Sequence, residues 1–254
     1  MTQELPKAPR PVHETIERTG DGAIIYDEKL VPHAAEAHFS ARGWKSVKPV
    51  ENVLRSGGRG NTLILGDGEN EFVLRHFRRG GLVGRVVRDS YIWLGEDKTR
   101  SFAEWRLLQK MTGMGLPVPK PAIARYRRNG PTYTADIITV RVPDIRSLSA
   151  RLADGEGDAA LWQRIGAGLA RFHEHGINHV DLNAHNVQID SDGNMWLLDF
   201  DNASIQPPGA WQQKNLARLH RSLRKIRQQD SRVNYSEQSW SALIDGYFQS
   251  SRSA

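Results

Sequence analysis

The stretch His179-Val-Asp-Leu-Asn-Ala-His-Asn186 decides the fold of this 254-residue chain, together with Leu198-Asp-Phe-Asp201 shortly after it. Two short apolar runs between them flank a polar turn and predict a β-hairpin over residues 187–200. Asn186 lies at the base of this hairpin and Asp199 at its end. Both side chains can therefore face one cleft, which makes this segment the first candidate for a functional site.

The order His-x-Asp-x-x-x-x-Asn, followed by Asp-Phe-Asp, resembles the catalytic loop and metal-binding segment of the protein-kinase-like superfamily. In that chemistry a carboxylate meets the attacking hydroxyl, which makes Asp181 the candidate catalytic base. An amide and a second carboxylate hold Mg²⁺ against the phosphates of ATP, which makes Asn186 and Asp199 the candidate metal ligands. His179 is expected to brace the loop. Asp201 replaces the usual glycine and either adds a carboxylate near the metal or packs in the loop.

A glycine-rich stretch stands where a loop over nucleotide phosphates is expected. Gly57, Gly58 and Gly60 precede a predicted strand, as such a loop would. The full G-x-G-x-x-G spacing is absent, so on its own this stretch also fits a plain hairpin turn. The three glycines are candidate nucleotide-binding residues because the other motifs indicate a kinase.

The next predicted strand ends on Arg75, where kinases usually carry a lysine. No lysine occurs between Lys48 and Lys98, so none is available for this role. Arginine keeps the positive charge and adds bidentate donors for phosphate, although the exchange is not neutral. Glu104, on a helix predicted over residues 99–112, is the expected ion-pair partner of Arg75. The alternative is that Glu104 is a solvated helix residue.

The pattern of the chain predicts an α+β fold class, a bilobal protein-kinase-like fold. Residues 1–20 are rich in proline and charge and predict a flexible segment. Residues 21–142 predict a β-rich N-lobe with one helix, for which Ser101 is the expected cap. Pro143-Asp144 marks a break, and residues 143–254 predict an α-rich C-lobe. The predicted strands cover residues 23–26, 61–65, 71–75 and 136–141, and the predicted helices cover residues 99–112, 162–172, 211–229 and 236–249.

Composition narrows the classes of protein. The absence of cysteine excludes a disulfide framework, a thiolate nucleophile and a cysteine-ligated metal site. No stretch reaches the ~18 consecutive apolar residues of a membrane-spanning helix. The N-terminal residues also lack the apolar region of a signal peptide, which predicts a protein that stays in the cytoplasm. A net charge of +6, from 35 Lys and Arg against 29 Asp and Glu, favours anionic partners.

Two departures from protein kinases favour a small-molecule or glycan hydroxyl as the acceptor. The chain has no Ala-Pro-Glu motif, and only a short segment separates Asp199 from the predicted helix near Trp211, too short for a regulatory activation loop. Asn183 also stands two residues after Asp181, where Ser/Thr protein kinases commonly carry a lysine.

Several segments together resemble the bacterial 3-deoxy-D-manno-octulosonic acid (Kdo) kinases of lipopolysaccharide assembly. The resemblance implies transfer of the γ-phosphate of ATP, with Mg²⁺, to the 4-hydroxyl of Kdo on a Kdo-lipid A precursor, which is an anionic glycolipid. It also implies a peripheral protein on the cytoplasmic face of the bacterial inner membrane. Asp181 would be the base, Asn186 and Asp199 the metal ligands, and Arg75 the phosphate-binding cation. The segments that carry the resemblance are residues 72–84, 102–108, 115–119, 179–186 and 199–201.

Two basic regions fit an anionic glycolipid and an anionic membrane surface. A cluster of arginines between the 71–75 strand and the 99–112 helix could bind the carboxylate of Kdo, the phosphates of lipid A or the leaflet, or it could be a solvated basic loop. A leucine stripe within residues 211–229, flanked by basic residues, predicts either an interfacial helix or a helix that packs its leucines inward. The cluster comprises Arg75, Arg78, Arg79, Arg85 and Arg88, and the stripe comprises Leu216, Leu219, Leu223 and Ile226.

Other functions stay open at this point. Heptose kinases of the lipopolysaccharide inner core share most of these motifs, and an aminoglycoside-like acceptor is disfavoured because a cationic sugar needs an acidic site. A catalytically dead kinase fold used as a binding module fits the Arg75 replacement but not the intact set of Asp181, Asn186 and Asp199. No recognised nucleic-acid-binding motif occurs, and no obligate protein partner is evident.

Overall fold

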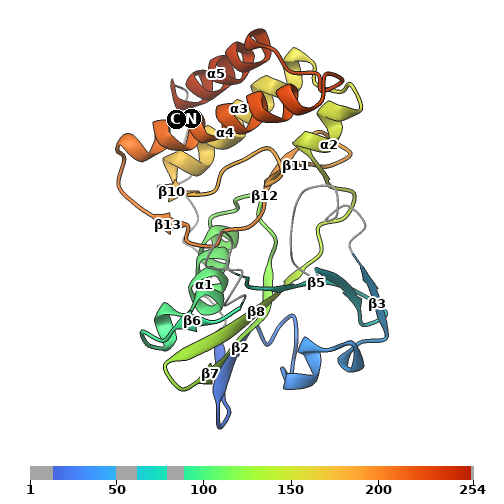
Figure 1. Ribbon diagram of the computed structural model, residues 1–254, viewed down its shortest axis with the longest axis vertical. Helices are drawn as coiled ribbons and strands as arrows, with labels where there is room; N and C mark the ends of the chain where they lie inside the picture. Colours follow the sequence, from blue (N-terminus) through green and yellow to red (C-terminus); the bar gives the residue numbers. More distant parts are fainter. Residues whose placement is uncertain (1–13, 50–61, 79–88, 253–254) are drawn as a thin grey trace, which may run out of the picture. The chain divides into compact units, whose positions relative to one another are not determined.

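The chain forms two compact units in the computed structural model (Figure 1). Unit 1 comprises Met1–Gly115 and Pro119–Arg141, and unit 2 comprises Leu116–Val118 and Val142–Ala254. Unit 1 is built on a β-sheet and unit 2 mainly on helices, so the α+β class is confirmed. The structure describes residues 14–49, 62–78 and 89–252.

Eight of the described strands form one antiparallel sheet in unit 1, in the order β1-β2-β7-β8-β5-β4-β3, with β6 paired to β8. β8 lies inside this order, and residues 135–138 are buried because both faces of the strand are covered. The strands are β1 Thr15–Arg18, β2 Gly22–Tyr26, β3 Ser46–Pro49, β4 Leu63–Gly66, β5 Glu71–His76, β6 Tyr91–Ile92, β7 Pro121–Asn129 and β8 Thr132–Val140.

Helix α1, Arg100–Gly113, packs on β7 and β8 through the predicted apolar stripe. Phe102, Trp105 and Leu108 are fully buried, and the ring of Phe102 lies edge-on to that of Tyr126 on β7, with centroids 5.3 Å apart. A second core cluster packs sheet residues such as Phe72 against the segment that contains the 3-10 helix η1, Glu36–Phe39. Two further short 3-10 helices are η2 Ala41–Gly43 and η5 Glu96–Lys98.

The structure differs from two expectations for unit 1. Composition predicts a flexible segment over residues 1–20, of which residues 1–13 lie outside the described part of the chain. Within the rest, Thr15–Arg18 forms β1, because its backbone pairs along β2 and Glu17 accepts a hydrogen bond of 2.6 Å from the hydroxyl of Tyr26. Ser101 is not the helix cap, since α1 begins at Arg100 with Thr99 at the N-cap position. Ser101 is buried within the first turn instead.

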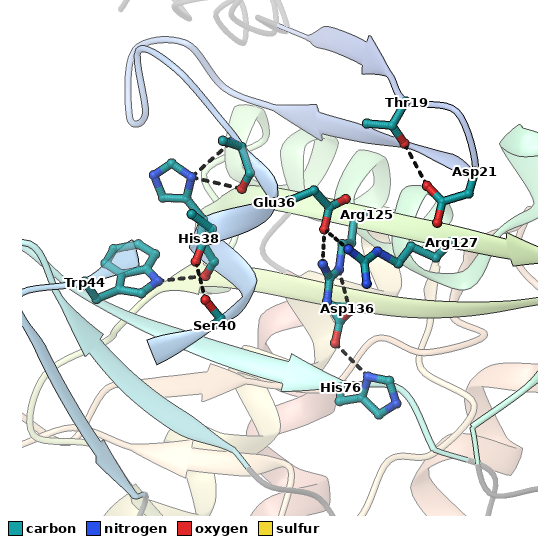
Figure 2. A network of polar contacts seen from close by, with 12 residues as sticks. Thr19, Asp21, Glu36, His38, Ser40, Trp44, His76, Arg125, Arg127 and Asp136 are labelled. Carbon is teal, nitrogen blue, oxygen red and sulfur yellow. Dashed lines mark hydrogen bonds and ion pairs between the residues drawn. The ribbon is translucent and has the colours of Figure 1, made fainter. Parts of the chain in front are cut away.

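A row of charged side chains crosses three adjacent strands of unit 1 (Figure 2). Arg125, Asp136 and His76 are cross-strand neighbours on β7, β8 and β5. Nε of Arg125 donates to Oδ2 of Asp136 at 2.8 Å, and Nδ1 of His76 lies 2.7 Å from Oδ1 of Asp136. Glu36 pairs with Arg125 from the other end of the row and accepts a bond of 2.7 Å from Arg127. The network joins η1 to the sheet.

This network makes part of the stability of unit 1 depend on pH. The hydrogen bond with Asp136 raises the pKa of His76 and outweighs its burial. Burial alone would raise the pKa of Asp136, but its bonds with His76 and Arg125 lower it. A raised histidine pKa contributes stability that is complete below the unfolded pKa of about 6.5. That stability is lost as the pH rises through the folded pKa of His76.

His76→Gln is therefore expected to lower the free energy of unfolding by on the order of 1 kcal/mol at pH 6, and by less at pH 9. Thermal melts of the two proteins at both pH values measure the difference. His33→Gln serves as the control, because the side chain of His33 is 93% exposed and its removal should leave the melting temperature unchanged. An equal loss for His76→Gln at both pH values would contradict this account.

Unit 2 contains four helices and five short strands among the described residues. β12 ends at Leu197, three residues before the predicted end at Phe200, because Asp199 has a left-handed backbone with φ of 62° that a strand cannot contain. The helices are α2 Leu148–Ala153, α3 Ala159–Glu174, α4 Ala210–Gln229 and α5 Glu237–Arg252. The strands are β9 Arg146–Ser147, β10 Ile177–Asn178, β11 Val187–Ile189, β12 Met195–Leu197 and β13 Ser204–Ile205, in the sheets β12-β11-β9 and β10-β13.

The leucine stripe of α4 packs inward. Leu216, Leu219 and Leu223 are buried in unit 2 and Ile226 is partly buried, which supports the second of the two interpretations left open by the sequence. The basic residues of the same helix lie on its exposed side. None of the described helices is apolar over enough of its length to cross a membrane.

Candidate functional site

Two asparagines hold the predicted catalytic loop, which lies between β10 and β11 of unit 2 (Figure 1). Nδ2 of Asn183 and Nδ2 of Asn186 both donate to the backbone carbonyl of Asp181, at 2.9 and 3.0 Å. Oδ1 of Asn183 accepts from the backbone N–H groups of His185 and Asn186, at 2.8 and 3.2 Å. Asparagine favours such local side-chain-to-backbone bonds, so the loop is closed without the carboxylate of Asp181.

The carboxylate of Asp181 is half exposed, with 49% of the side-chain surface accessible. Its Oδ1 accepts a hydrogen bond from Nη2 of Arg218 on α4. An exposed carboxylate on a closed loop can be reached by a substrate hydroxyl, as a general base requires. The structure therefore places the predicted base at an accessible position with a cation beside it.

His179 supports the loop through contacts of its buried side chain. Its side chain is buried, and its Nε2 lies 3.0 Å from the carbonyl oxygen of Leu198, the residue before Asp199. Burial lowers the pKa of His179, so the imidazole is neutral and donates to this carbonyl. Its ring also packs against Phe200, with centroids 4.9 Å apart. His179 thus connects the loop that carries Asp181 to the segment that carries Asp199.

The two candidate metal ligands belong to the same part of unit 2. The backbone N–H of Leu198 donates to the carbonyl of Asn186 at 3.0 Å, which holds Asp199 close to the base of the hairpin. The bond from Nδ2 of Asn186 to Asp181 fixes the orientation of the amide, so that its oxygen is the group a cation can bind. One amide oxygen and one carboxylate, completed by nucleotide phosphates and water, are a donor set that fits Mg²⁺. The described residues contain no cluster of three or more His, Asp or Glu side chains suited to a metal.

The second group of predicted residues lies in unit 1, where Arg75 on β5 and Glu104 on α1 form an ion pair. Nη2 of Arg75 donates to Oε2 of Glu104 at 2.5 Å, and the side chain of Glu104 is only 4% exposed. The guanidinium also lies over the ring of Phe77, 4.5 Å from its centroid. The expected pairing is present, and a buried carboxylate of this kind needs its partner because an unpaired buried charge is costly.

Some sequence predictions fall on residues that the structure does not describe. They are Gly57, Gly58 and Gly60 of the glycine-rich stretch, and Arg79, Arg85 and Arg88 of the basic cluster. These assignments stay predictions.

The support that α4 provides to the catalytic loop is not indicated by the sequence. Asn215, Arg218 and Ser222 each contact the loop, and they are spaced as one face of a helix requires. Their polar side chains interrupt no apolar stripe, and the contact joins residues more than 30 positions apart. A helical-wheel comparison of polar as well as apolar positions on α4 would have singled out this face, but not its partner.

Comparisons with known proteins agree with these motifs. The model of the lipopolysaccharide kinase (Kdo/WaaP) family matches residues 45–247. The chain is 42% identical over 213 residues to the 3-deoxy-D-manno-octulosonic acid kinase of Xanthomonas campestris pv. campestris (strain B100), covering 83% of this chain and 84% of that protein. It is 44% identical over 214 residues to the protein of the same name from Stenotrophomonas maltophilia (strain K279a), again covering 83% of this chain and 84% of that protein.

Among solved structures, the bifunctional kinase-methyltransferase WbdD is similar with a TM-score of 0.41 and 16% sequence identity, covering 82% of this chain and 47% of that chain. The family model spans most of the chain, and the two relatives exceed 40% identity over most of their own length. The chain therefore belongs to the lipopolysaccharide kinase (Kdo/WaaP) family.

Proposed function

We propose that this protein is an ATP-dependent kinase that phosphorylates the 4-hydroxyl of Kdo on a Kdo-lipid A precursor in lipopolysaccharide core assembly. The observation that carries the proposal is the closed catalytic loop, which presents the half-exposed carboxylate of Asp181 beside the segment of Asn186 and Asp199. Family membership and the names of the relatives support Kdo as the acceptor sugar.

In the proposed reaction, Asp181 orients the sugar hydroxyl and takes its proton as the oxygen attacks the γ-phosphorus in line. The bond from the γ-phosphorus to the β,γ-bridging oxygen breaks, and ADP leaves. Asn186 and Asp199 would hold Mg²⁺, which offsets the charge that develops on the phosphates. Arg75, held by Glu104, would bind the nucleotide phosphates with its fork of N–H donors. His179 keeps the two loop segments in register and exchanges no proton with the substrate, since its side chain is buried and its Nε2 is bonded to the carbonyl of Leu198.

The experiment that tests this function measures phosphate transfer to two acceptors in parallel. The purified protein is incubated with γ-labelled ATP, Mg²⁺ and either a Kdo-bearing lipid A precursor or a heptose-bearing core acceptor. Label on the Kdo acceptor, abolished by a chelator, is expected. Label on the heptose acceptor alone would move the assignment to a heptose kinase. No label on either acceptor would favour a kinase fold that acts only as a binding module.

Glu104→Gln is expected to raise the KM for ATP about tenfold, because loss of the charged partner frees the guanidinium of Arg75 from its position on β5. Steady-state kinetics at varied ATP concentration measure this change. Asp97→Asn is the matched control. Asp97 also pairs with a residue of α1, Arg106, but its side chain is 80% exposed. An unchanged KM in Glu104→Gln would show that the pair has no part in nucleotide binding.

The lipid nature of the proposed acceptor supports a peripheral position on the cytoplasmic face of the inner membrane. Because the leucines of α4 are buried, the proposed attachment does not use them, and it relies on basic side chains facing anionic lipid instead. Such attachment weakens as salt is added. Co-sedimentation with anionic vesicles at low and high salt tests this part of the proposal, and binding that is insensitive to salt would contradict it.

A further inference from the structure

One face of α4 supports the catalytic loop at three successive points. Oδ1 of Asn215 accepts a hydrogen bond of 3.0 Å from the backbone N–H of His179. Oγ of Ser222 accepts one of 3.2 Å from the backbone N–H of Ala184. Arg218 lies between these two contacts on the same face and donates to the carboxylate of Asp181. The two outer contacts bind backbone and fix the loop, whereas Arg218 alone of the three reaches the carboxylate proposed to do chemistry.

Arg218 brings a cation to a place where the loop itself carries none. Asn183 occupies the position at which Ser/Thr protein kinases commonly have lysine, and it is neutral. Both ends of its amide are used within the loop, by the carbonyl of Asp181 and the N–H groups of His185 and Asn186. Asn183 therefore cannot extend toward an anionic substrate, while the guanidinium of Arg218 stands beside the base.

Stability is a weak explanation for this ion pair. The side chains of Arg218 and Asp181 are 48% and 49% exposed. Exposed ion pairs contribute about 0–1 kcal/mol to the free energy of unfolding. Both groups are instead accessible to a substrate. A guanidinium carries five N–H donors in a planar fork, so one bond to Asp181 leaves further donors that suit a second carboxylate.

The proposed acceptor sugar carries a carboxylate close to the hydroxyl that is phosphorylated. In Kdo the carboxylate is borne on the ring carbon that is separated by a single carbon from the one bearing the 4-hydroxyl. When that hydroxyl meets Asp181, the carboxylate of the same sugar can reach the guanidinium of Arg218, which is bonded to Asp181. A neutral heptose has no such carboxylate.

We propose that Arg218 binds the carboxylate of the acceptor sugar and thereby selects an acidic sugar over a neutral one. The inference rests on the proposed function, since it assumes that Asp181 receives the sugar hydroxyl. Arg218 bridges the base and the acceptor: one Nη group holds Asp181, and the remaining donors bind the sugar carboxylate. It is then a specificity residue for the acceptor, and ATP binding does not depend on it.

The test varies both Arg218 and the acceptor carboxylate that Arg218 is proposed to bind. Wild type and Arg218→Gln are each assayed with the Kdo acceptor and with a matched acceptor whose carboxylate is reduced to a primary alcohol. Wild type should use the reduced acceptor about 30-fold less efficiently, the size of a charge-assisted hydrogen bond. Arg218→Gln should lose about the same factor on the native acceptor, mainly through a higher acceptor KM, and should no longer distinguish the two acceptors.

Two further variants separate binding from folding. Arg218→Lys keeps the charge without the fork and should recover only part of the discrimination. Arg221→Gln removes an exposed arginine one turn further along α4 and should discriminate as wild type does. Circular dichroism melts confirm that each variant is folded, and the reduced acceptor tests the inference on the unmodified protein.

Four results would overturn the inference. Equal use of both acceptors by wild type would show that the carboxylate is not recognised. A fall in kcat for Arg218→Gln by the same factor on both acceptors would make Arg218 only a positioning residue for Asp181, and a raised KM for ATP would assign it to the nucleotide. If wild type transferred phosphate to no Kdo acceptor, the proposed function would fail, and this inference with it.

Discussion

Asp181→Asn is expected to lower kcat for phosphoryl transfer by about 10³-fold and to leave the KM for ATP within about twofold of wild type. The amide has the shape of the carboxylate but cannot take the proton of the attacking hydroxyl. The loop should survive the change, because Asn183 and Asn186 bind the backbone carbonyl of Asp181 and not its carboxylate. The expected loss is therefore chemical and not conformational.

Steady-state kinetics with the Kdo acceptor, together with a thermal melt, measure this outcome. Asp192→Asn is the matched control: it also removes one carboxylate from unit 2, but Asp192 is an exposed residue of the turn between β11 and β12. Its kcat should equal that of wild type. An Asp181→Asn variant that retained near-normal transfer would show that another group accepts the proton.

Gly166→Ala is expected to destabilise unit 2 by about 3 kcal/mol or more, because two helices approach through their backbones at this position. A Cβ on Gly166 of α3 would lie 1.9 Å from the carbonyl oxygen of Leu243 and 2.7 Å from the backbone nitrogen of Tyr247, both on α5. Gly246 on α5 forms the other half of the contact, since its Cβ would lie 2.1 Å from the carbonyl oxygen of Gln163. Backbone atoms cannot yield unless the helices separate.

Chemical denaturation of Gly166→Ala measures the loss, and Gly168→Ala on the same helix provides the control. The three described atoms nearest to a Cβ on Gly168 all belong to the side chain of Met195, whose flexible end can move aside. The higher helix propensity of alanine offsets part of that cost, so the stability of Gly168→Ala should stay within about 1 kcal/mol of wild type. Equal stability of Gly166→Ala and wild type would show that the α3–α5 contact is looser than the structure has it.

The residues proposed for catalysis could be predicted because their chemistry requires a short, ordered spacing. Asp181 and Asn186 are five positions apart in one loop, and Asp199 follows a hairpin whose strands are themselves predictable from apolar runs. The pairing of Arg75 with Glu104 spans 29 positions, and it was predictable because a strand cation and a helix carboxylate follow one another in the kinase pattern.

The features that escaped prediction depend on tertiary contacts. Arg218 and Asp181 are 37 positions apart, and nothing local to either residue indicates the contact. The direction of the α4 leucines was undecided because an apolar stripe flanked by basic residues suits both a protein core and a lipid surface. Thr15–Arg18 forms a strand because the free edge of β2 pairs with it, whereas its own composition indicates a flexible segment.

The proposed function depends most directly on which atom of the acceptor receives the phosphate. The decisive measurement incubates the protein with γ-labelled ATP and Mg²⁺, once with a Kdo-lipid A precursor and once with the same precursor carrying 4-deoxy-Kdo. Label on the first acceptor and none on the second is the predicted result, with phosphorus NMR placing the phosphate on the 4-oxygen. Equal labelling of both acceptors would contradict the assignment.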